Sequence, residues 1–396
     1  MDYIKTFDIE LEKEQYYAGE TLVGWVVIEN TENIKARGVR CFLRGKAHVE
    51  WKITRGGERR TVKEDQYFVD EKKVVWGKDK HEEGSFPIMP RGHHHFRFEF
   101  KLPECALPCS FESKMGTIRY YLRVIFDIPY ASTPQGLKYF TVIGPHVDCM
   151  EDRYLVPVSC AAQSEQCCLC CVVGPVNIEA TLERSAYCCG EKVKLKYEIQ
   201  NGGEENAWVI CRLIQNVEYH INKGVLGLTK ETQHEVWEAR GQAVRPHTTE
   251  SFHDFYKNLQ VPVMPATLVD VCKVIDIYYI LRVSLGLEKS GERLGMEFPI
   301  DIGTMPFRIP NSPAPTIRYE MAVDYVEGGL YISPEFQLGQ VYDGTAEHSR
   351  EDIILYRPVY VCVPDTSCAI INTGSHATDG SVMGNDELTE EKCTSV

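Results

Sequence analysis

Residues 120–124 read YYLRV and residues 278–283 read YYILRV, so nearly the same sequence occurs twice in the chain. The first stretch belongs to a longer segment, residues 118–128, in which every second side chain is apolar. Successive side chains of a β-strand point to opposite faces of a sheet, so this alternation indicates a strand with one face on a core. Similar alternation recurs at residues 7–11 and 96–102, whereas helical periodicity is nearly absent. An all-β fold is therefore expected.

The spacing around the two stretches is repeated as well. Pro103 lies 20 positions before Arg123, and Pro262 lies 20 positions before Arg282. Three more pairs of segments match, and they occur in the same order in the two halves of the chain. These pairs are residues 19–23 and 190–194, 102–103 and 261–262, and 140–145 and 299–303. Two unrelated units would not be expected to agree in both order and spacing. We therefore predict two copies of one unit, each built from antiparallel sheets packed face to face.

The predicted architecture is two tandem immunoglobulin-like β-sandwich domains followed by a tail. The first sandwich is expected at residues 1–152 and the second at residues 173–310, with a cysteine-rich inter-domain segment at residues 153–172. A length of 396 residues suits two domains of this kind. Residues 311–396 begin with prolines that discourage regular structure, and this tail is expected to be largely disordered.

The negative charge of the chain is concentrated in that tail. The formal net charge is −14, and residues 304–396, with 14 acids and 5 bases, account for −9 of it. Nucleic-acid binding is not expected, because it depends on basic side chains that neutralise phosphates.

The sequence also indicates a cellular location. The first residues lack the apolar core of a signal peptide. No stretch approaches the roughly 18 apolar residues of a membrane span. The 16 cysteines are therefore expected to be reduced and partly buried thiols, and the expected location is the cytoplasm.

Several short motifs occur together in an order that is typical of one family. They are YAGE at residues 17–20, VRCFLRG at 39–45, FEFKLP at 98–103, GTIRYYLRV at 116–124, CCLCCVVGP at 167–175 and IGTMP at 302–306. With these motifs, residues 5–310 resemble the arrestin fold of the α-arrestin (arrestin domain-containing) family, which includes thioredoxin-interacting protein. Each motif is weak alone, and the combination is specific.

The resemblance implies a non-enzymatic adaptor without a cofactor. Members of the family bind membrane cargo, such as receptors or transporters, with the sandwich pair. They recruit HECT-type ubiquitin ligases through proline–tyrosine motifs in the tail, so that cargo is ubiquitinated and sorted by endocytic protein transport, with effects on signal transduction. The resemblance thus implies recruitment from the cytoplasm to the plasma membrane and endosomes.

Two other functions remain open at this point. A sorting-coat subunit could share the fold and would need no proline–tyrosine motif. A metal- or redox-controlled regulatory scaffold could use the cysteine cluster. An enzyme is not expected and no catalytic residue is predicted, because the chain lacks Gly-x-Ser-x-Gly, a phosphate-binding Gly-Lys-Ser/Thr loop and His-Glu-x-x-His.

The tail contains a degenerate ligase-binding motif, RPVY at residues 357–360. WW domains bind Pro-Pro-x-Tyr as a polyproline II turn, in which the prolines fill an aromatic groove and the tyrosine enters a second pocket. Arg357 replaces the first proline, so only Pro358 and Tyr360 remain. We expect weaker binding than that of a full motif, and a chance Pro-x-Tyr sequence is the alternative.

The C-terminus fits a PDZ ligand. In such a complex the extended terminus adds a strand to a sheet edge, Val396 fills a pocket and Thr394 supplies a hydroxyl. The last four residues also resemble a prenylation box, but Thr394 and Ser395 stand where aliphatic residues are usual, so prenylation is not expected.

A cysteine cluster with the Cys-x-x-Cys spacing of zinc ligands is formed by Cys167, Cys168, Cys170 and Cys171. Cys188 and Cys189 follow, but neighbouring residues of a strand point to opposite faces, so the two cannot easily complete one tetrahedral site. Palmitoylation of the cluster is a second hypothesis. Buried or half-exposed thiols on a strand are the third, and no metal site is assigned.

Overall fold

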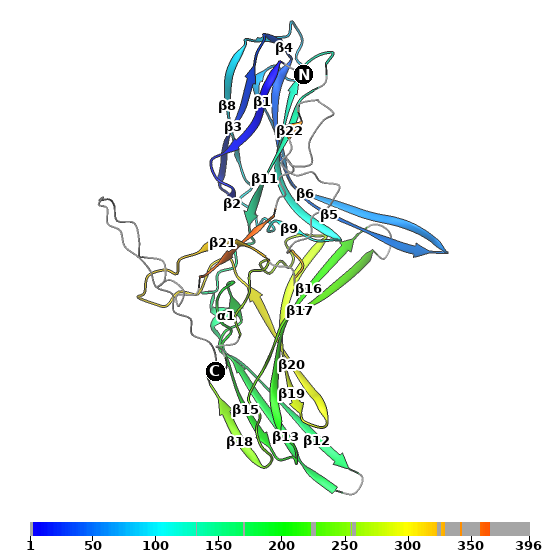
Figure 1. The fold of residues 1–396 in the computed structure, drawn as a ribbon, viewed down its shortest axis with the longest axis vertical. Coiled ribbons are helices and arrows are strands. Elements are labelled where there is room, and N and C mark those ends of the chain that lie inside the picture. The colour runs from blue at the N-terminus through cyan, green and yellow to red at the C-terminus, as the bar shows by residue number, and fades with distance from the viewer. Residues whose placement is uncertain are drawn as a thin grey trace, which may run out of the picture.

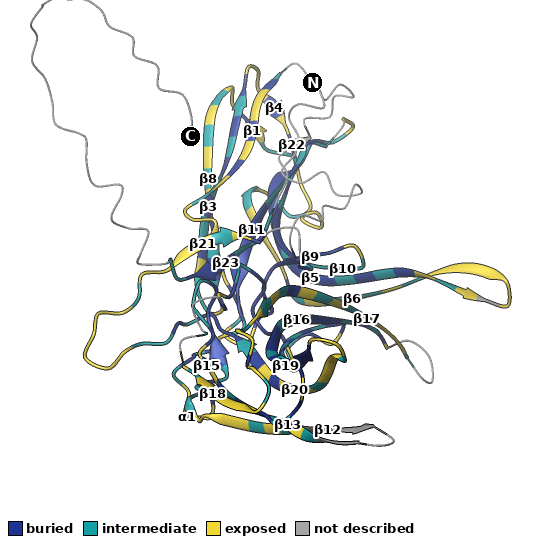
Figure 2. Ribbon diagram, turned by 60° about the horizontal axis from the view of Figure 1, so that its bottom comes forward, coloured by how far each residue is buried: buried dark blue, intermediate teal, exposed yellow. Residues whose placement is uncertain are grey.

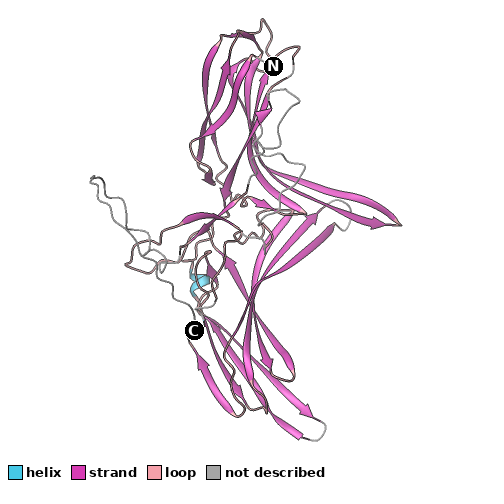
Figure 3. Ribbon diagram, viewed as in Figure 1, coloured by secondary structure: helices cyan, strands magenta, loops and turns pink. Residues whose placement is uncertain are grey.

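The computed structural model contains two β-sandwiches that lie end to end, the first at the top of Figure 1 and the second at the bottom. Nearly all of the regular structure is strand, and the one helix in the described part of the chain, α1 (Asp152–Leu155), lies in the connection between the sandwiches (Figure 3). The all-β prediction is thus confirmed. The structure describes residues 3–131, 133–168, 171–222, 227–253, 255, 259–322, 326–328, 341–342 and 357–364.

The first sandwich has a small sheet and a large one. The small sheet has the order β1 (Ile4–Leu11), β3 (Thr21–Asn30) and β8 (Gly92–Lys101). The large sheet has the order β2 (Gln15–Tyr17), β11 (Gln135–Ile143), β10 (Gly116–Asp127), β5 (Gly38–Arg55) and β6 (Glu58–Gly77). Short strands add to it: β9 (Phe111–Glu112) pairs with β10, and β22 (Val341–Tyr342) pairs with β11. Separately, β4 (Ile34–Lys35) pairs with β7 (Ile88–Met89).

The second sandwich is built in the same way. One sheet has the order β12 (Val158–Cys168), β13 (Cys171–Leu182), β15 (Leu195–Asn201) and β18 (Thr248–Phe252). The other has the order β14 (Ala186–Tyr187), β20 (Gly291–Ile302), β19 (Ile275–Leu287), β16 (Ala207–Ile221) and β17 (Leu228–Arg240).

The large sheets of the two sandwiches correspond strand by strand. The order β2-β11-β10-β5-β6 in the first matches β14-β20-β19-β16-β17 in the second. In each sheet the short first strand is parallel to its neighbour, whereas the following pairs along this order are antiparallel. The matched stretches of the sequence lie in β10 and β19, which are the central strands. The predicted duplication is therefore visible in the topology.

The repeated Gly-Glu dipeptide makes the same turn in both sandwiches. Gly19 has φ of +78° and Gly190 has φ of +86°, a backbone region that favours glycine. The carboxylate of Glu20 accepts a hydrogen bond from the Tyr17 backbone N–H at 2.7 Å, and the carboxylate of Glu191 accepts one from the Cys188 N–H, also at 2.7 Å. The glutamate thus satisfies a backbone donor that the turn would otherwise leave without a partner.

The alternating apolar side chains form the core, as expected. Tyr120, Leu122 and Val124 of β10 are fully buried, as are Leu281 and Val283 of β19. Burial of each such side chain contributes about 1.5–3 kcal/mol. Figure 2 shows the buried residues concentrated on the facing strands, whereas the end of the β5–β6 hairpin is exposed.

One polar residue departs from the alternation. The sequence pattern predicts an outward position for Arg119, but its side chain is only 2% exposed. The reason is β9, which covers the start of β10 and brings the Glu112 carboxylate to the guanidinium, with one of two hydrogen bonds at 2.6 Å. Burial raises the pKa of Glu112, and Arg119 opposes that shift. Alternation along the strand alone therefore does not place this arginine.

Two segments are more regular than the sequence suggested. Residues 158–168 of the predicted inter-domain segment form β12, which pairs with β13 as part of the second sandwich. In the predicted disordered tail, β21 (Arg318–Met321) pairs with β23 (Val359–Cys362) across a wide gap in sequence. These two short strands lie within a tail that was predicted to be largely disordered.

We predict that Glu112→Ala destabilises the first sandwich by about 3–5 kcal/mol, because it removes the carboxylate that is paired with the buried Arg119 charge. Thermal unfolding followed by circular dichroism measures the effect. The double variant Glu112→Leu, Arg119→Met removes both charges and should recover most of the loss. A single variant as stable as the unaltered chain would contradict this account.

Candidate functional site

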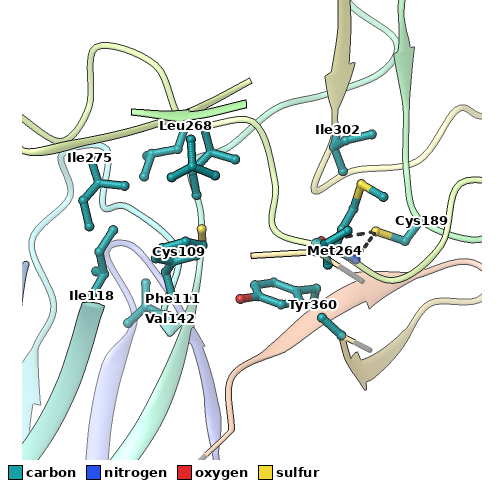
Figure 4. Close-up of a cluster of buried hydrophobic side chains, with 14 of the residues drawn as sticks. Cys109, Phe111, Ile118, Val142, Cys189, Met264, Leu268, Ile275, Ile302 and Tyr360 are labelled. Carbon is teal, nitrogen blue, oxygen red and sulfur yellow. Dashed lines mark hydrogen bonds between the residues drawn. The ribbon is translucent and has the colours of Figure 1, made fainter. Parts of the chain in front are cut away.

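The two sandwiches meet in an apolar contact region that we call the seam. It comprises residues 107–116 and 140–149 of the first sandwich and residues 187–190, 264–268 and 302–305 of the second. Buried side chains from both sides belong to one continuous hydrophobic cluster. In Figure 4, Leu268 of the second sandwich lies just above Cys109 and Phe111 of the first. The seam is therefore a shared core.

Backbone and side-chain hydrogen bonds fix the register of this contact. The N–H of Thr304 donates to the Val147 carbonyl at 3.0 Å, and the Val147 N–H donates to the Thr304 hydroxyl oxygen at 3.0 Å. Farther along, the hydroxyl groups of Ser113 and Tyr219 form a hydrogen bond of 2.8 Å, and both residues are buried. These bonds satisfy polar groups that burial would otherwise penalise.

A tyrosine from the tail enters the seam. Tyr360, on β23, is only 4% exposed. Its hydroxyl donates toward two backbone carbonyls, that of Ser110 at 3.2 Å and that of Gly328 at 3.4 Å. Figure 4 shows the ring close to Met264, with Cys189 beyond it. Tyr360 thus contacts both sandwiches at once.

The end of β23 is bound to the second sandwich through its backbone. Cys362 forms a parallel bridge with Cys189, and the Val363 N–H donates to the Cys189 carbonyl at 2.8 Å. The neighbouring Gly190 allows this close approach. A Cβ atom at that position would lie 1.9 Å from the Val363 carbonyl oxygen, which is far inside van der Waals contact. The path of the tail strand therefore requires glycine at residue 190.

The residues predicted to bind a WW domain are the ones that lie in the seam. Pro358 and Tyr360 are both buried. A WW domain needs the faces of the proline and the tyrosine free to enter its own grooves. In this conformation Val359 and Tyr360 begin β23, Pro358 just before it is buried, and the Arg-Pro-Val-Tyr segment is not presented as a polyproline II ligand.

Other predicted site residues lie partly or wholly outside the described residues. Thr394 and Val396 of the PDZ-type C-terminus lie outside them, as does Cys170. The backbones of Cys167 and Cys168 end β12, and Cys168 stands opposite Cys171 at the start of β13. The side chains of these cysteines are not described, so the zinc and palmitoylation hypotheses stay untested.

A different pair of thiols comes together at the seam. The sulfur atoms of Cys149 and Cys188 are 4.0 Å apart, and both residues are buried. The contact with Cys149, together with burial, raises the pKa of Cys188 far above its usual range. Cys189, by contrast, points to the other side, where its thiol donates to the Met264 carbonyl at 3.4 Å. The expectation that Cys188 and Cys189 face opposite ways is confirmed.

Cys149, Cys188 and Glu191 are grouped closely enough to be considered as metal ligands. Cys188 and Glu191 are already engaged in other ways. The Cys188 thiol donates to the Gly303 carbonyl at 3.2 Å, and the Glu191 carboxylate binds Arg184 at 2.9 Å as well as the Cys188 N–H. Zinc prefers four tetrahedral ligands with thiolates deprotonated. Packing of two buried thiols against each other accounts for this arrangement without a metal.

Comparison with known families agrees with this architecture. The model of the arrestin (or S-antigen) N-terminal domain matches residues 6–148, and that of the C-terminal domain matches residues 173–307. The chain belongs to the arrestin family. The two matched domains coincide with the two sandwiches, so the seam of this arrestin is the contact between its N- and C-terminal domains.

Similar proteins come from several animals. Arrestin domain-containing protein 4 of Mus musculus is 26% identical over 313 residues, 77% of this chain and 73% of the relative. Arrestin domain-containing protein 17 of Caenorhabditis elegans is 27% identical over 311 residues, 74% of this chain and 68% of the relative. Thioredoxin-interacting protein of Homo sapiens is 22% identical over 335 residues, 84% of this chain and 83% of the relative. Within the described residues, no helix of this arrestin has the length and apolar character of a membrane span.

Sequence reasoning missed the seam. It paired the turn at Gly190 with the one at Gly19 but did not indicate that Gly190 faces the tail, because that contact comes from a residue 173 positions later. A weak signal was present in residues 358–364 (PVYVCVP), which are free of charge in an otherwise acidic tail. An uncharged, β-branched stretch of this kind indicates a strand.

Thiol reactivity tests the described burial of the seam. Cys105 is exposed, whereas its neighbour Cys109 is buried and its pKa is raised by burial to about 12. Because the thiolate is the reactive form, iodoacetamide at neutral pH should modify Cys105 on the order of 100-fold faster than Cys109. Peptide mass spectrometry measures both rates in one sample, with urea-unfolded protein as the control. Similar rates in the native arrestin would contradict the packing described here.

Proposed function

We propose that this arrestin is a non-enzymatic adaptor that binds membrane receptors or transporters through its sandwiches and links them to a HECT-type ubiquitin ligase for endocytic transport. Membership of the arrestin family supports the adaptor role in general. The observation that carries the proposal is the tail strand: the segment with Pro358 and Tyr360 is held where the two arrestin domains meet. Cargo recognition by the domains and exposure of the tail can therefore influence each other.

The chemistry of the seam supports an adaptor over an enzyme. Several of its buried thiols have pKa values that are raised by burial, such as that of Cys189, which is raised to about 12. Burial also raises the pKa of Tyr219 and Tyr279, so both stay protonated at neutral pH. Groups that remain protonated throughout the neutral range serve packing and hydrogen bonding, and they are poorly suited to general acid–base catalysis.

The proposal includes the cellular setting and a further partner. The arrestin would act in the cytoplasm and reach the plasma membrane and endosomes by binding cargo. Its C-terminal Thr394 and Val396 would bind a PDZ protein by adding a strand to the edge of a sheet. Both statements rest on the family and on the tail sequence.

A sorting-coat subunit is the second candidate, and one observation favours it. Pro358 and Tyr360 are buried, and a coat subunit would need neither residue exposed. Such a subunit would use the seam only to keep its two domains in one orientation. The two candidates differ in whether the released tail segment binds a WW domain.

Binding of a peptide with residues 354–366 to a purified WW domain of a HECT ligase tests the ligase link. We predict weak binding for the natural peptide and about tenfold tighter binding, or ~1.4 kcal/mol, for Arg357→Pro, which restores the missing proline. Fluorescence anisotropy of the labelled peptides measures both affinities.

The Tyr360→Ala peptide serves as the control and should not bind. If neither the natural nor the Arg357→Pro peptide binds, the ligase link through this segment is wrong and the coat subunit is favoured. Affinity purification of the whole arrestin from cells then identifies its cargo or its coat partners.

A further inference from the structure

We infer that the seam is a binding site for an extended, uncharged peptide with a central tyrosine, and that residues 358–364 of this chain fill the site themselves. A WW domain and the seam then compete for the same tyrosine. The competition with a ligase rests on the proposed function, whereas the occupation of the seam does not.

The first element of this site is a pocket for the tyrosine ring. Tyr360 and Val361 line one small cavity together with Cys109 and Ile143 of the first sandwich and Met264 of the second. The Ser110 carbonyl accepts the phenolic hydroxyl from within the first sandwich. A buried ring with a satisfied hydroxyl is specific, because phenylalanine would leave the carbonyl without its donor and a smaller residue would leave a void.

The second element holds the backbone of the peptide. On one edge β23 pairs with β21 in antiparallel register, with Tyr360 opposite Glu320. On the other edge its end is bound to the Cys189 carbonyl through the Val363 N–H. Backbone pairing of this kind accepts an extended segment largely independently of its sequence, whereas the tyrosine pocket selects the residue at one position.

The third element is charge. Residues 358–364 carry no ionisable acid or base other than the Tyr360 phenol and the Cys362 thiol. The charged side chain of Arg357 comes directly before them. The apolar seam accepts such a segment without the cost of burying a charge. The acidic residues elsewhere in the tail would not be accepted.

Occupation of the seam and binding to a WW domain exclude each other. Both use the ring of Tyr360 and the face of Pro358, and the ring is 4% exposed while it lies in the seam. Only molecules in which β23 has left the seam can bind a WW domain. The apparent association constant is therefore the intrinsic constant multiplied by the fraction of such molecules. The strand can leave without unfolding either sandwich, because β21 and β23 form a separate two-stranded sheet, which is marginal on its own.

Gly190→Ala provides a change that weakens the site and leaves the tail sequence intact. Its new methyl group would lie 1.9 Å from the Val363 carbonyl oxygen and 3.2 Å from the Cys362 sulfur, so β23 must move away. Gly19→Ala is a matched control in the equivalent turn of the first sandwich. That glycine has a similar positive φ, but the nearest atom to an added Cβ is Glu104 Cγ at 3.4 Å, and among the described residues no tail atom lies within 4 Å of that Cβ.

The experiment uses the full-length arrestin, as the unaltered chain, Gly190→Ala and Gly19→Ala, with two readouts. The first is the rate at which iodoacetamide modifies Cys362, which is 6% exposed on β23. The second is the affinity for a purified WW domain of a HECT ligase, with the peptide of residues 354–366 as the reference. We expect Gly190→Ala to increase both the labelling rate and the affinity at least tenfold, and Gly19→Ala to change neither.

The possible outcomes separate the two parts of the inference. Equal labelling of Cys362 in Gly190→Ala and Gly19→Ala would overturn the occupation of the seam. Unaltered arrestin that binds the WW domain as tightly as the peptide would overturn the competition. If the peptide does not bind at all, the ligase link fails, and the labelling rates still decide whether the seam holds the tail.

A second variant keeps the test valid if Gly190→Ala does not fold. Val363→Pro removes the N–H that donates to the Cys189 carbonyl at 2.8 Å and leaves Pro358 and Tyr360 unchanged. It should also raise the labelling of Cys362 at least tenfold. Labelling at the rate of the unaltered chain would overturn the role given to this hydrogen bond and to the site.

Discussion

Close apolar packing between the two sandwiches is the constraint on which the rest of this structure depends. At Gly116, an added Cβ would lie 2.8 Å from the ring of Tyr219 on the opposite side of the seam. Contacts this tight leave one favourable orientation, because packed interiors do not deform continuously. The same orientation brings Ser110 and Cys189 to the two sides of the tail strand, so the site for β23 exists only while the sandwiches are in contact.

The tail strand in turn contributes to that contact. Tyr360 fills space between the sandwiches. The strand that carries it pairs with β21, and at its end Cys362 forms a bridge with Cys189 in the turn at Gly190. Binding at the seam and the orientation of the domains are therefore linked: whatever removes the strand also removes apolar contacts shared by both sandwiches. Linkage of this type is reciprocal, so a partner that alters the domain contact also changes how often the strand is released.

Much of the fold could be predicted from the sequence, because alternation and repeat spacing are local signals. The matched stretches in β10 and β19, and the paired turns at Gly19 and Gly190, were all visible as patterns. The buried Arg119 was not, since its partner Glu112 lies on a two-residue strand too short to show a pattern. The position of Tyr360 was not predictable either, because contacts between distant segments leave no periodicity. The motif was recognised, and its burial was not.

Hydrogen exchange of the full-length arrestin tests the central claim most directly. The amides of residues 359–363 are in a strand whose Val363 N–H is bonded to the Cys189 carbonyl, so a peptide covering these residues should exchange far more slowly than unstructured chain. Its protection should fall when the seam is opened by Gly190→Ala. Exchange of this peptide at the rate of unstructured chain in the unaltered arrestin would contradict the account, because the tail strand would then not occupy the seam.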